Sequence, residues 1–273
     1  MSRLPGLFRT LREAGKTGLV PFVTAGDPSF QGTVPLLHAL VSAGADAIEL
    51  GIPFSDPMAD GPVIQRASER ALGRGVTVRQ ILAWVQEFRE KNQTTPIILM
   101  GYLNPVEAMG VERFAEAAAA AGADGVILVD LTPEESAHEV EVLRRFHLDP
   151  IFLLAPTSSP ARVATVKRLG SGFVYYVSLR GITGGEQRDW DEVAQRTAQL
   201  RQELGMPVVV GFGIRDATVA GHLAASGCDA VVIGSALVER LSDARDDRHA
   251  QGIATEFLLS FREALGRRMG EGT

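Results

Sequence analysis

Eight short apolar segments recur along the chain, and each is bounded by glycine, proline or a polar residue. Most of them are continuously apolar rather than alternating, which is typical of parallel strands that are covered on both faces. They lie at residues 18–26, 46–51, 96–102, 125–130, 150–156, 173–178, 207–213 and 230–235. Amphipathic segments with helical spacing separate them, at 34–44, 78–91, 111–122, 134–146, 160–170, 191–205 and 216–227. This alternation predicts an α/β fold with a parallel sheet.

The number of these units narrows the fold further. Eight strands, seven intervening helices and a closing helix at 256–269 predict a (β/α)8 TIM barrel, and residues 4–15 predict an extra N-terminal helix. A Gly-x-Asp-small-apolar pattern that recurs at 42–50, 120–128 and 225–233 favours a repeated unit. No linker or low-complexity segment divides the chain, so we expect one TIM-barrel domain over residues 1–273. An open doubly wound sheet is the structural alternative.

The composition argues against several classes of partner and compartment. A net charge of −6 does not suit a protein that binds nucleic acid or an anionic membrane, because both need a basic face. Cys228 is the only cysteine, so no internal disulfide can form, which fits a reducing compartment. The first residues have no apolar core of a signal peptide, and no apolar run approaches the roughly 20 residues of a membrane helix. We therefore expect a cytoplasmic protein.

The loops after the seventh and eighth predicted strands are rich in small residues. The stretches GFGIRD at 211–216 and IGSALV at 233–238 allow the backbone to approach a ligand closely. In TIM barrels these two loops commonly bind phosphate through backbone N–H groups. Gly213, Gly234 and Ser235 are therefore candidate phosphate-binding residues, although the same glycines can serve only to make tight strand-to-helix turns.

The residues that other barrel chemistries require are missing from the predicted strand ends. A Schiff-base mechanism needs a lysine in the barrel mouth, whereas Lys16, Lys91 and Lys167 precede a strand or lie in or near helices. No pair of histidines has the spacing of metal ligands next to a strand end, so we expect no metal site. The remaining candidates for catalysis are carboxylates.

Glu49 is the most informative of these carboxylates, because it ends the second predicted strand. It lies between Ile48 and Leu50 and therefore points to the opposite face. If those two side chains pack against the helices, Glu49 points into the barrel near its mouth. Burial raises the pKa of a carboxyl group, and a raised pKa suits proton transfer at neutral pH. The alternative is a structural ion pair with an arginine.

Three further aspartates follow strand ends and have local explanations as well. Asp60 precedes the predicted helix GPVIQRASERAL with Pro62 in its first turn, so it could be catalytic or could cap that helix. Asp56, in the sequence SDP, is typical of a turn. Asp130 ends the fourth strand, and we expect it to cap the helix that follows DLTPEE.

Several stretches at these strand ends together resemble one family. IELGIPFSDPMADGP at 48–62 closely resembles the signature of the tryptophan synthase alpha subunit. The same resemblance continues, in order, through PFVTAGDP, GYLNPV, YYVSLRGITGGE, GFGI and IGSALV, from about residue 18 to about residue 240. It implies a TIM-barrel lyase that cleaves indole-3-glycerol phosphate to indole and glyceraldehyde 3-phosphate, with no cofactor in this chain.

The resemblance also implies roles for individual residues. Glu49 matches the catalytic acid and base, and Asp60 matches the carboxylate that interacts with the indole N–H, which favours the catalytic interpretation of Asp60. Thr183 matches a loop residue that folds towards Asp60. The positions that match the apolar indole slot are Phe22, Met100, Ile127 and Tyr175, and those that match the phosphate site are Gly184, Gly213, Gly234 and Ser235. Leu179 and Arg180 depart from relatives that carry the arginine one position earlier, so closure of this loop could differ in detail.

The family also implies a partner. This is a beta subunit that carries pyridoxal phosphate, joined in an αββα complex in which indole passes to the beta subunit for tryptophan synthesis. Asp56, Asn104 and Pro105 lie on the face that would meet this subunit. The alternative function is a stand-alone lyase that releases free indole. A non-catalytic phosphate-binding barrel, a phosphosugar isomerase and an indole-glycerol-phosphate synthase are further alternatives, and the missing barrel-mouth lysine argues against the last.

Overall fold

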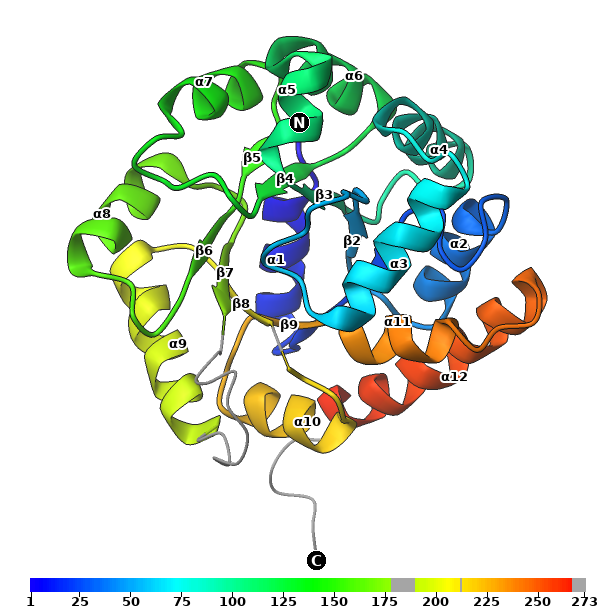
Figure 1. Cartoon of the computed structure of the whole chain (residues 1–273). Coiled ribbons are helices and arrows are strands. Elements are labelled where there is room, and N and C mark those ends of the chain that lie inside the picture. Colours follow the sequence, from blue (N-terminus) through cyan, green and yellow to red (C-terminus); the bar gives the residue numbers. More distant parts are fainter. Residues whose placement is uncertain (178–189, 212, 267–273) are drawn as a thin grey trace, which may run out of the picture.

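The computed structural model describes residues 1–177, 190–211 and 213–266. Within these ranges, nine parallel strand segments form one sheet in the order β5-β4-β3-β2-β1-β9-β8-β7-β6. Only Ile151 separates β5 from β6, and these two segments pair with β4 and β7 respectively, so the sheet closes into a ring (Figure 1). The strands are β1 (Gly18–Thr24), β2 (Ile48–Gly51), β3 (Ile97–Gly101), β4 (Gly125–Leu128), β5 (Asp149–Pro150), β6 (Phe152–Leu154), β7 (Val174–Val177), β8 (Val208–Gly211) and β9 (Ala230–Ile233).

Helices surround this ring, and α1 (Leu4–Glu13) lies within the outline of the ring in the view of Figure 1. They are α1 (Leu4–Glu13), α2 (Thr33–Ser42), α3 (Pro62–Gly73), α4 (Val78–Lys91), α5 (Leu103–Met109), α6 (Val111–Ala121), α7 (Ala137–Arg145), α8 (Pro160–Leu169), α9 (Trp190–Leu204), α10 (Ala217–Ala225), α11 (Ser235–Leu241) and α12 (Asp247–Gly266). The predicted TIM barrel with its extra N-terminal helix is confirmed. Because β5 and β6 stand at the two ends of the strand order and yet are separated by a single residue, the open doubly wound sheet is excluded.

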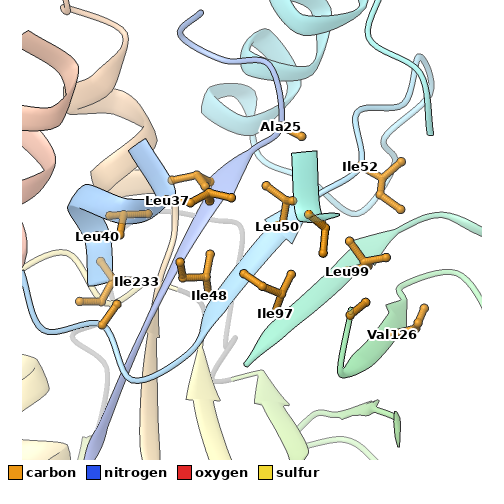
Figure 2. Packing of buried hydrophobic residues seen from close by; sticks show 14 of the residues in the cluster. Ala25, Leu37, Leu40, Ile48, Leu50, Ile52, Ile97, Leu99, Val126 and Ile233 are labelled. Atoms are coloured by element: carbon orange, nitrogen blue, oxygen red, sulfur yellow. The ribbon is translucent and has the colours of Figure 1, made fainter. Parts of the chain in front are cut away.

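Side chains of the strands alternate between two separate apolar cores. Ile48, Leu50, Ile97 and Leu99 belong to the outer core between the strands and the helices, and Figure 2 shows them along β2 and β3. The intervening residues face the barrel interior, where Val20, Phe22, Ile98, Met100, Ile127, Tyr175, Val209 and Val232 form the inner core. Since both faces of most strands are buried, the strands are mostly continuous apolar runs rather than alternating ones.

Helix α1 closes the N-terminal end of the barrel. Its Leu4, Phe8 and Leu11 belong to the inner core, and the Phe8 ring lies 5.8 Å from that of Phe173. At the same end, Asp124 precedes β4 and accepts hydrogen bonds from Arg3 Nη1 at 3.0 Å and from Arg89 Nη2 at 3.0 Å. The opposite end, at the carboxyl ends of the strands, therefore remains for a ligand.

The structure departs from the sequence prediction in local details. The fifth predicted strand is split in two next to Pro150, which has no backbone N–H to donate to the ladder. The short helices α5 and α11 were not predicted, and α12 begins at Asp247 rather than at residue 256. Helix α3 begins at Pro62, as predicted from its sequence.

Candidate active site

A cavity of about 300 Å³ opens among the loops at the carboxyl ends of the strands. It receives side chains from the ends of β1, β2, β3 and β7 and backbone from the loops after β8 and β9. The predicted site residues that line it are Phe22, Glu49, Asp60, Met100, Tyr175, Gly213, Gly234 and Ser235. The fold therefore brings together residues that lie more than 200 positions apart in the sequence.

Glu49 lies on the inner wall of this cavity. It is 1% exposed and pairs in register with Phe22 of β1 and Ile98 of β3, so it lies between apolar residues of the two neighbouring strands. Neither carboxyl oxygen has a hydrogen-bond partner among the described residues, so no arginine of the described ranges forms the structural ion pair considered above. Burial, and then the charge of Asp60, raise the pKa of Glu49 from 4.5 to about 8. The group is therefore protonated at neutral pH.

Asp60 reaches the same cavity from the loop between β2 and α3. Its Oδ2 accepts a hydrogen bond from the phenol of Tyr102 at 3.0 Å. The residue at the N-cap of α3 is Gly61, and no side chain caps that helix, so Asp60 does not act as its cap. Burial raises the pKa of Asp60, and the hydrogen bond from Tyr102 opposes this rise. The site thus contains a neutral carboxylic acid, Glu49, and a second carboxyl group, Asp60. The hydrogen bond that Tyr102 donates to Asp60 favours the ionised form of Asp60.

The apolar lining of the cavity includes two large rings that face glycines. A Cβ atom on Gly51 would lie 2.6 Å from Phe22 Cζ, and one on Gly211 would overlap the phenol of Tyr175. These two rings can therefore occupy the barrel interior only because the neighbouring strands end in glycine. Met100 also lines the cavity, whereas Ile127 is fully buried in the inner core and is not among the residues that line it.

The other end of the cavity is formed by backbone. Gly213 has a φ of 77°, which favours glycine. Among the described residues, no hydrogen bond occupies the backbone N–H groups of Gly213, Gly234 and Ser235. Arg215 lines the same end, and its side chain forms no ion pair with the described part of the chain. Unoccupied N–H donors beside a cation can bind an anion.

Asp130 and Asp56, the other two aspartates that follow strand ends, lie outside the cavity. Asp130 Oδ1 accepts a hydrogen bond from the backbone N–H of Leu103, at 2.8 Å. It therefore binds the first turn of α5 in the preceding unit, and the prediction that it caps the helix after DLTPEE is wrong. Asp56 lies on an exposed loop, where Ser55 Oγ donates to it at 2.5 Å. Asn104 is exposed at the start of α5, next to the half-buried Pro105.

Thr183 and Gly184, together with Leu179 and Arg180, lie outside the described residues. Within the described ranges, no group of three or more histidine, cysteine, aspartate or glutamate side chains could hold a metal ion. No helix in the same ranges is both long enough and apolar enough to cross a membrane.

Comparison with known proteins identifies the family. The family model for the tryptophan synthase alpha chain matches residues 8–264. A tryptophan synthase alpha chain of Acidithiobacillus ferrooxidans is 65% identical over 97% of this chain and 97% of its own length. The chain belongs to the tryptophan synthase alpha chain family.

Solved structures agree with this assignment. Tryptophan synthase subunit alpha from Legionella pneumophila superposes with a TM-score of 0.89 at 40% identity, covering 97% of this chain and 98% of that one. A chain of the tryptophan synthase complex from Pyrococcus furiosus superposes with a TM-score of 0.80 at 36% identity, covering 91% and 98%. The resemblance inferred from the strand-end sequences is therefore confirmed at the level of the family.

Two residues of this tryptophan synthase alpha-family site were not singled out from the sequence. Tyr102 directly follows β3 and holds Asp60, but an aromatic residue at a strand end is also ordinary core. Arg215 lies two positions after Gly213 in GFGIRD, and its place at the backbone-lined end of the cavity could have been suspected from that spacing. The cue for both was their position at a strand end or in the loop that follows it, the place where TIM barrels carry their chemistry.

Proposed function

We propose that this chain cleaves indole-3-glycerol phosphate to indole and glyceraldehyde 3-phosphate by a retro-aldol reaction. The observation that carries the proposal is Glu49, a buried carboxyl group with a pKa of about 8 and no protein partner among the described residues, on the wall of a cavity that also contains Asp60. A carboxyl group that is neutral at pH 7 is poised to give a proton to its ligand. Membership of the tryptophan synthase alpha chain family supports the choice of substrate.

In the first step, the proton of Glu49 is transferred to C3 of the indole ring. The carbon–carbon bond to the glycerol chain cannot readily break while indole is aromatic, because the ring has no place for the electrons of that bond. Protonation at C3 places a positive charge on the ring nitrogen and makes the ring an electron acceptor. A positioned proton donor of this kind contributes roughly 10²–10⁴-fold to a rate.

In the second step, the Glu49 carboxylate takes the proton of the hydroxyl group next to the ring. The oxygen forms the aldehyde C=O bond, the carbon–carbon bond breaks, and its electrons return to the indole ring. Glu49 is again protonated, so the proton balance closes without another group. Its raised pKa suits both halves of this cycle, since neither the acid nor the carboxylate is strongly favoured near pH 8.

Asp60 stabilises the positive charge that the ring carries between the first and the second step. When the ring nitrogen becomes positive, its N–H is a stronger donor, and an ionised Asp60 stabilises it. The hydrogen bond from Tyr102 favours that ionised form. Because the interaction strengthens as the charge develops, it lowers the barrier rather than only binding the substrate.

The remaining cavity wall suits the two ends of the substrate. Phe22, Met100 and Tyr175 offer an apolar surface for the ring. The unoccupied N–H groups of Gly213, Gly234 and Ser235 would bind the phosphate, and Arg215 would add a positive charge. Thr183 and Gly184 keep the roles that the family resemblance implies.

We also propose a tryptophan synthase beta subunit as the partner, in an αββα complex that meets the face with Asp56, Asn104 and Pro105. The Pyrococcus furiosus structure is that of a tryptophan synthase complex, which supports this part of the proposal. The beta subunit would carry pyridoxal phosphate, and this chain would act without a cofactor of its own. A cytoplasmic location belongs to the same proposal.

The test is an indole-release assay on the wild type, Glu49→Gln and Asp60→Asn, each with and without a cognate beta subunit. We expect Glu49→Gln to lose about 10²–10⁴-fold in turnover while it still binds the substrate. Addition of the beta subunit should raise the rate of the wild type, and the two proteins should copurify. Normal turnover by Glu49→Gln would remove the proposed chemistry, and a wild type that is unaffected by the beta subunit would favour the stand-alone lyase.

A further inference from the structure

The phenol of Tyr102 has both of its hydrogen bonds committed. The backbone N–H of Ala59 donates to the phenol oxygen at 3.0 Å, and the phenol O–H donates to Asp60 Oδ2 at 3.0 Å. Because a phenol has one proton to donate, acceptance from Ala59 directs that proton to Asp60. The ring itself is 4% exposed and packs 5.2 Å from the ring of Phe54, so its position is fixed by packing as well.

The same contacts leave one oxygen of Asp60 for a ligand. Tyr102 occupies Oδ2, whereas Oδ1 accepts no hydrogen bond from the described residues. The backbone of Asp60 is also held, since its N–H donates to the Pro57 carbonyl at 3.0 Å and its own carbonyl accepts from Gln65 Nε2 at 2.9 Å. The carboxyl group is therefore anchored at one oxygen and at its backbone, with the other oxygen uncommitted beside the cavity.

The charges around this pair are few. Glu49 and Tyr175 are the titratable groups whose pKa values the charge of Asp60 raises from across the cavity, and Asp130 acts on Tyr102 from the loop beside α5. Burial, and next Asp60, raise the pKa of Tyr102, so the phenol keeps the proton that it donates. Burial disfavours the ionised form of Asp60, and the hydrogen bond from the Tyr102 phenol favours it.

We propose that Tyr102 is a positioning residue for the reaction: its phenol holds Asp60 by one oxygen so that the other is presented to the N–H of the indole ring. This role rests on the proposed function, because it assigns an orientation to the carboxylate that is to stabilise the developing charge. Tyr102 touches neither the ring nor the reacting carbon in this scheme and acts through Asp60 alone.

The test compares Tyr102→Phe with the wild type and with Tyr176→Phe. The phenylalanine keeps the ring that packs on Phe54 and removes only the phenol oxygen. Tyr176 lies on the outer face of β7, so its replacement is a matched loss of a buried phenol away from the cavity. We expect Tyr102→Phe to lower kcat about 10- to 100-fold with little change in KM, since a hydrogen bond to a charged group is lost.

Two further measurements separate positioning from a general loss of structure. The acidic limb of the pH profile of kcat/KM should move to higher pH in Tyr102→Phe, because the ionised form of Asp60 loses its donor, and should stay in place in Tyr176→Phe. In a double-mutant cycle, Tyr102→Phe should lower kcat only slightly when Asp60 is already replaced by Asn. An unshifted acidic limb, or full additivity with Asp60→Asn, would overturn the inference while leaving the lyase activity intact. A wild type that releases no indole would instead overturn the proposed function and this inference together.

Discussion

The buried Glu49 predicts a stability that falls as the pH rises. In the unfolded chain this carboxyl group ionises near pH 4.5, whereas in the folded chain it keeps its proton until about pH 8. Between these values the folded state binds the extra proton, so the free energy of unfolding decreases with increasing pH. One pKa unit corresponds to 1.36 kcal/mol, which gives a cost of about 3 kcal/mol at pH 7 and about 5 kcal/mol above pH 8. The cost is absent below pH 4.5.

Replacement of Glu49 by Gln removes this cost while nearly conserving volume. We expect Glu49→Gln to be more stable than the wild type by about 3 kcal/mol at pH 7, and by less than about 1 kcal/mol at pH 5. The measurement is urea denaturation at pH 5, 7 and 8.5, from which the free energy of unfolding is obtained by linear extrapolation. Glu116→Gln, at an exposed position of α6, controls for the loss of one carboxylate.

The result that would refute this reasoning is a stability difference between Glu49→Gln and the wild type that stays constant from pH 5 to 8.5. A variant that is less stable than the wild type at pH 8.5 would refute it as well. A constant difference would mean that folding does not raise the pKa of Glu49, so that the group is ionised in the folded chain at neutral pH and could not then be the proton donor. The expected outcome instead links the stability of the fold to the raised pKa of Glu49. The same burial that destabilises the fold at neutral pH keeps this carboxyl group protonated.

Three further changes test other parts of the molecule. Arg215→Gln should raise KM for the phosphate-bearing substrate about two- to fivefold, as expected for an exposed charge; an equal rise in KM for indole in the reverse reaction would contradict its role at the phosphate. Gly211→Ala should displace the Tyr175 phenol and destabilise the fold by about 1–3 kcal/mol, measured by thermal unfolding, and unchanged stability would show that the ring has room to move. Arg89→Met should cost about 3–5 kcal/mol in urea denaturation, because it leaves Asp124 buried with only part of its partners; a neutral effect would show that Arg3 alone suffices.

The sequence predicted the barrel because its signal is repeated in every unit. Each strand is buried on both faces, so an apolar run marks it regardless of its neighbours. The inward direction of Glu49 followed from its phase relative to Ile48 and Leu50, and the structure confirms it. The split of the fifth strand was not predicted, since it depends on how one short segment divides its pairing between two neighbours.

Contacts between units could not be derived from local patterns. Asp130 fits a cap of the helix that follows it, but neighbouring loops lie side by side at the barrel mouth, and its carboxylate binds Leu103 of the preceding unit instead. The bond between Tyr102 and Asp60 likewise joins residues 42 positions apart. Such pairings depend on the strand register, because the register decides which residues of neighbouring loops lie at the same level of the barrel. The sequence of one loop does not reveal this register.

The most direct measurement of the central claim is hydrogen exchange at C3 of indole in D2O. This exchange isolates the proton transfer assigned to Glu49, since it needs no phosphate and no carbon–carbon cleavage. We predict that the wild-type chain accelerates the exchange over the rate in buffer, that Asp60→Asn slows it, and that Glu49→Gln abolishes the acceleration. An exchange rate in Glu49→Gln equal to that of the wild type would contradict the account, because another group would then deliver the proton.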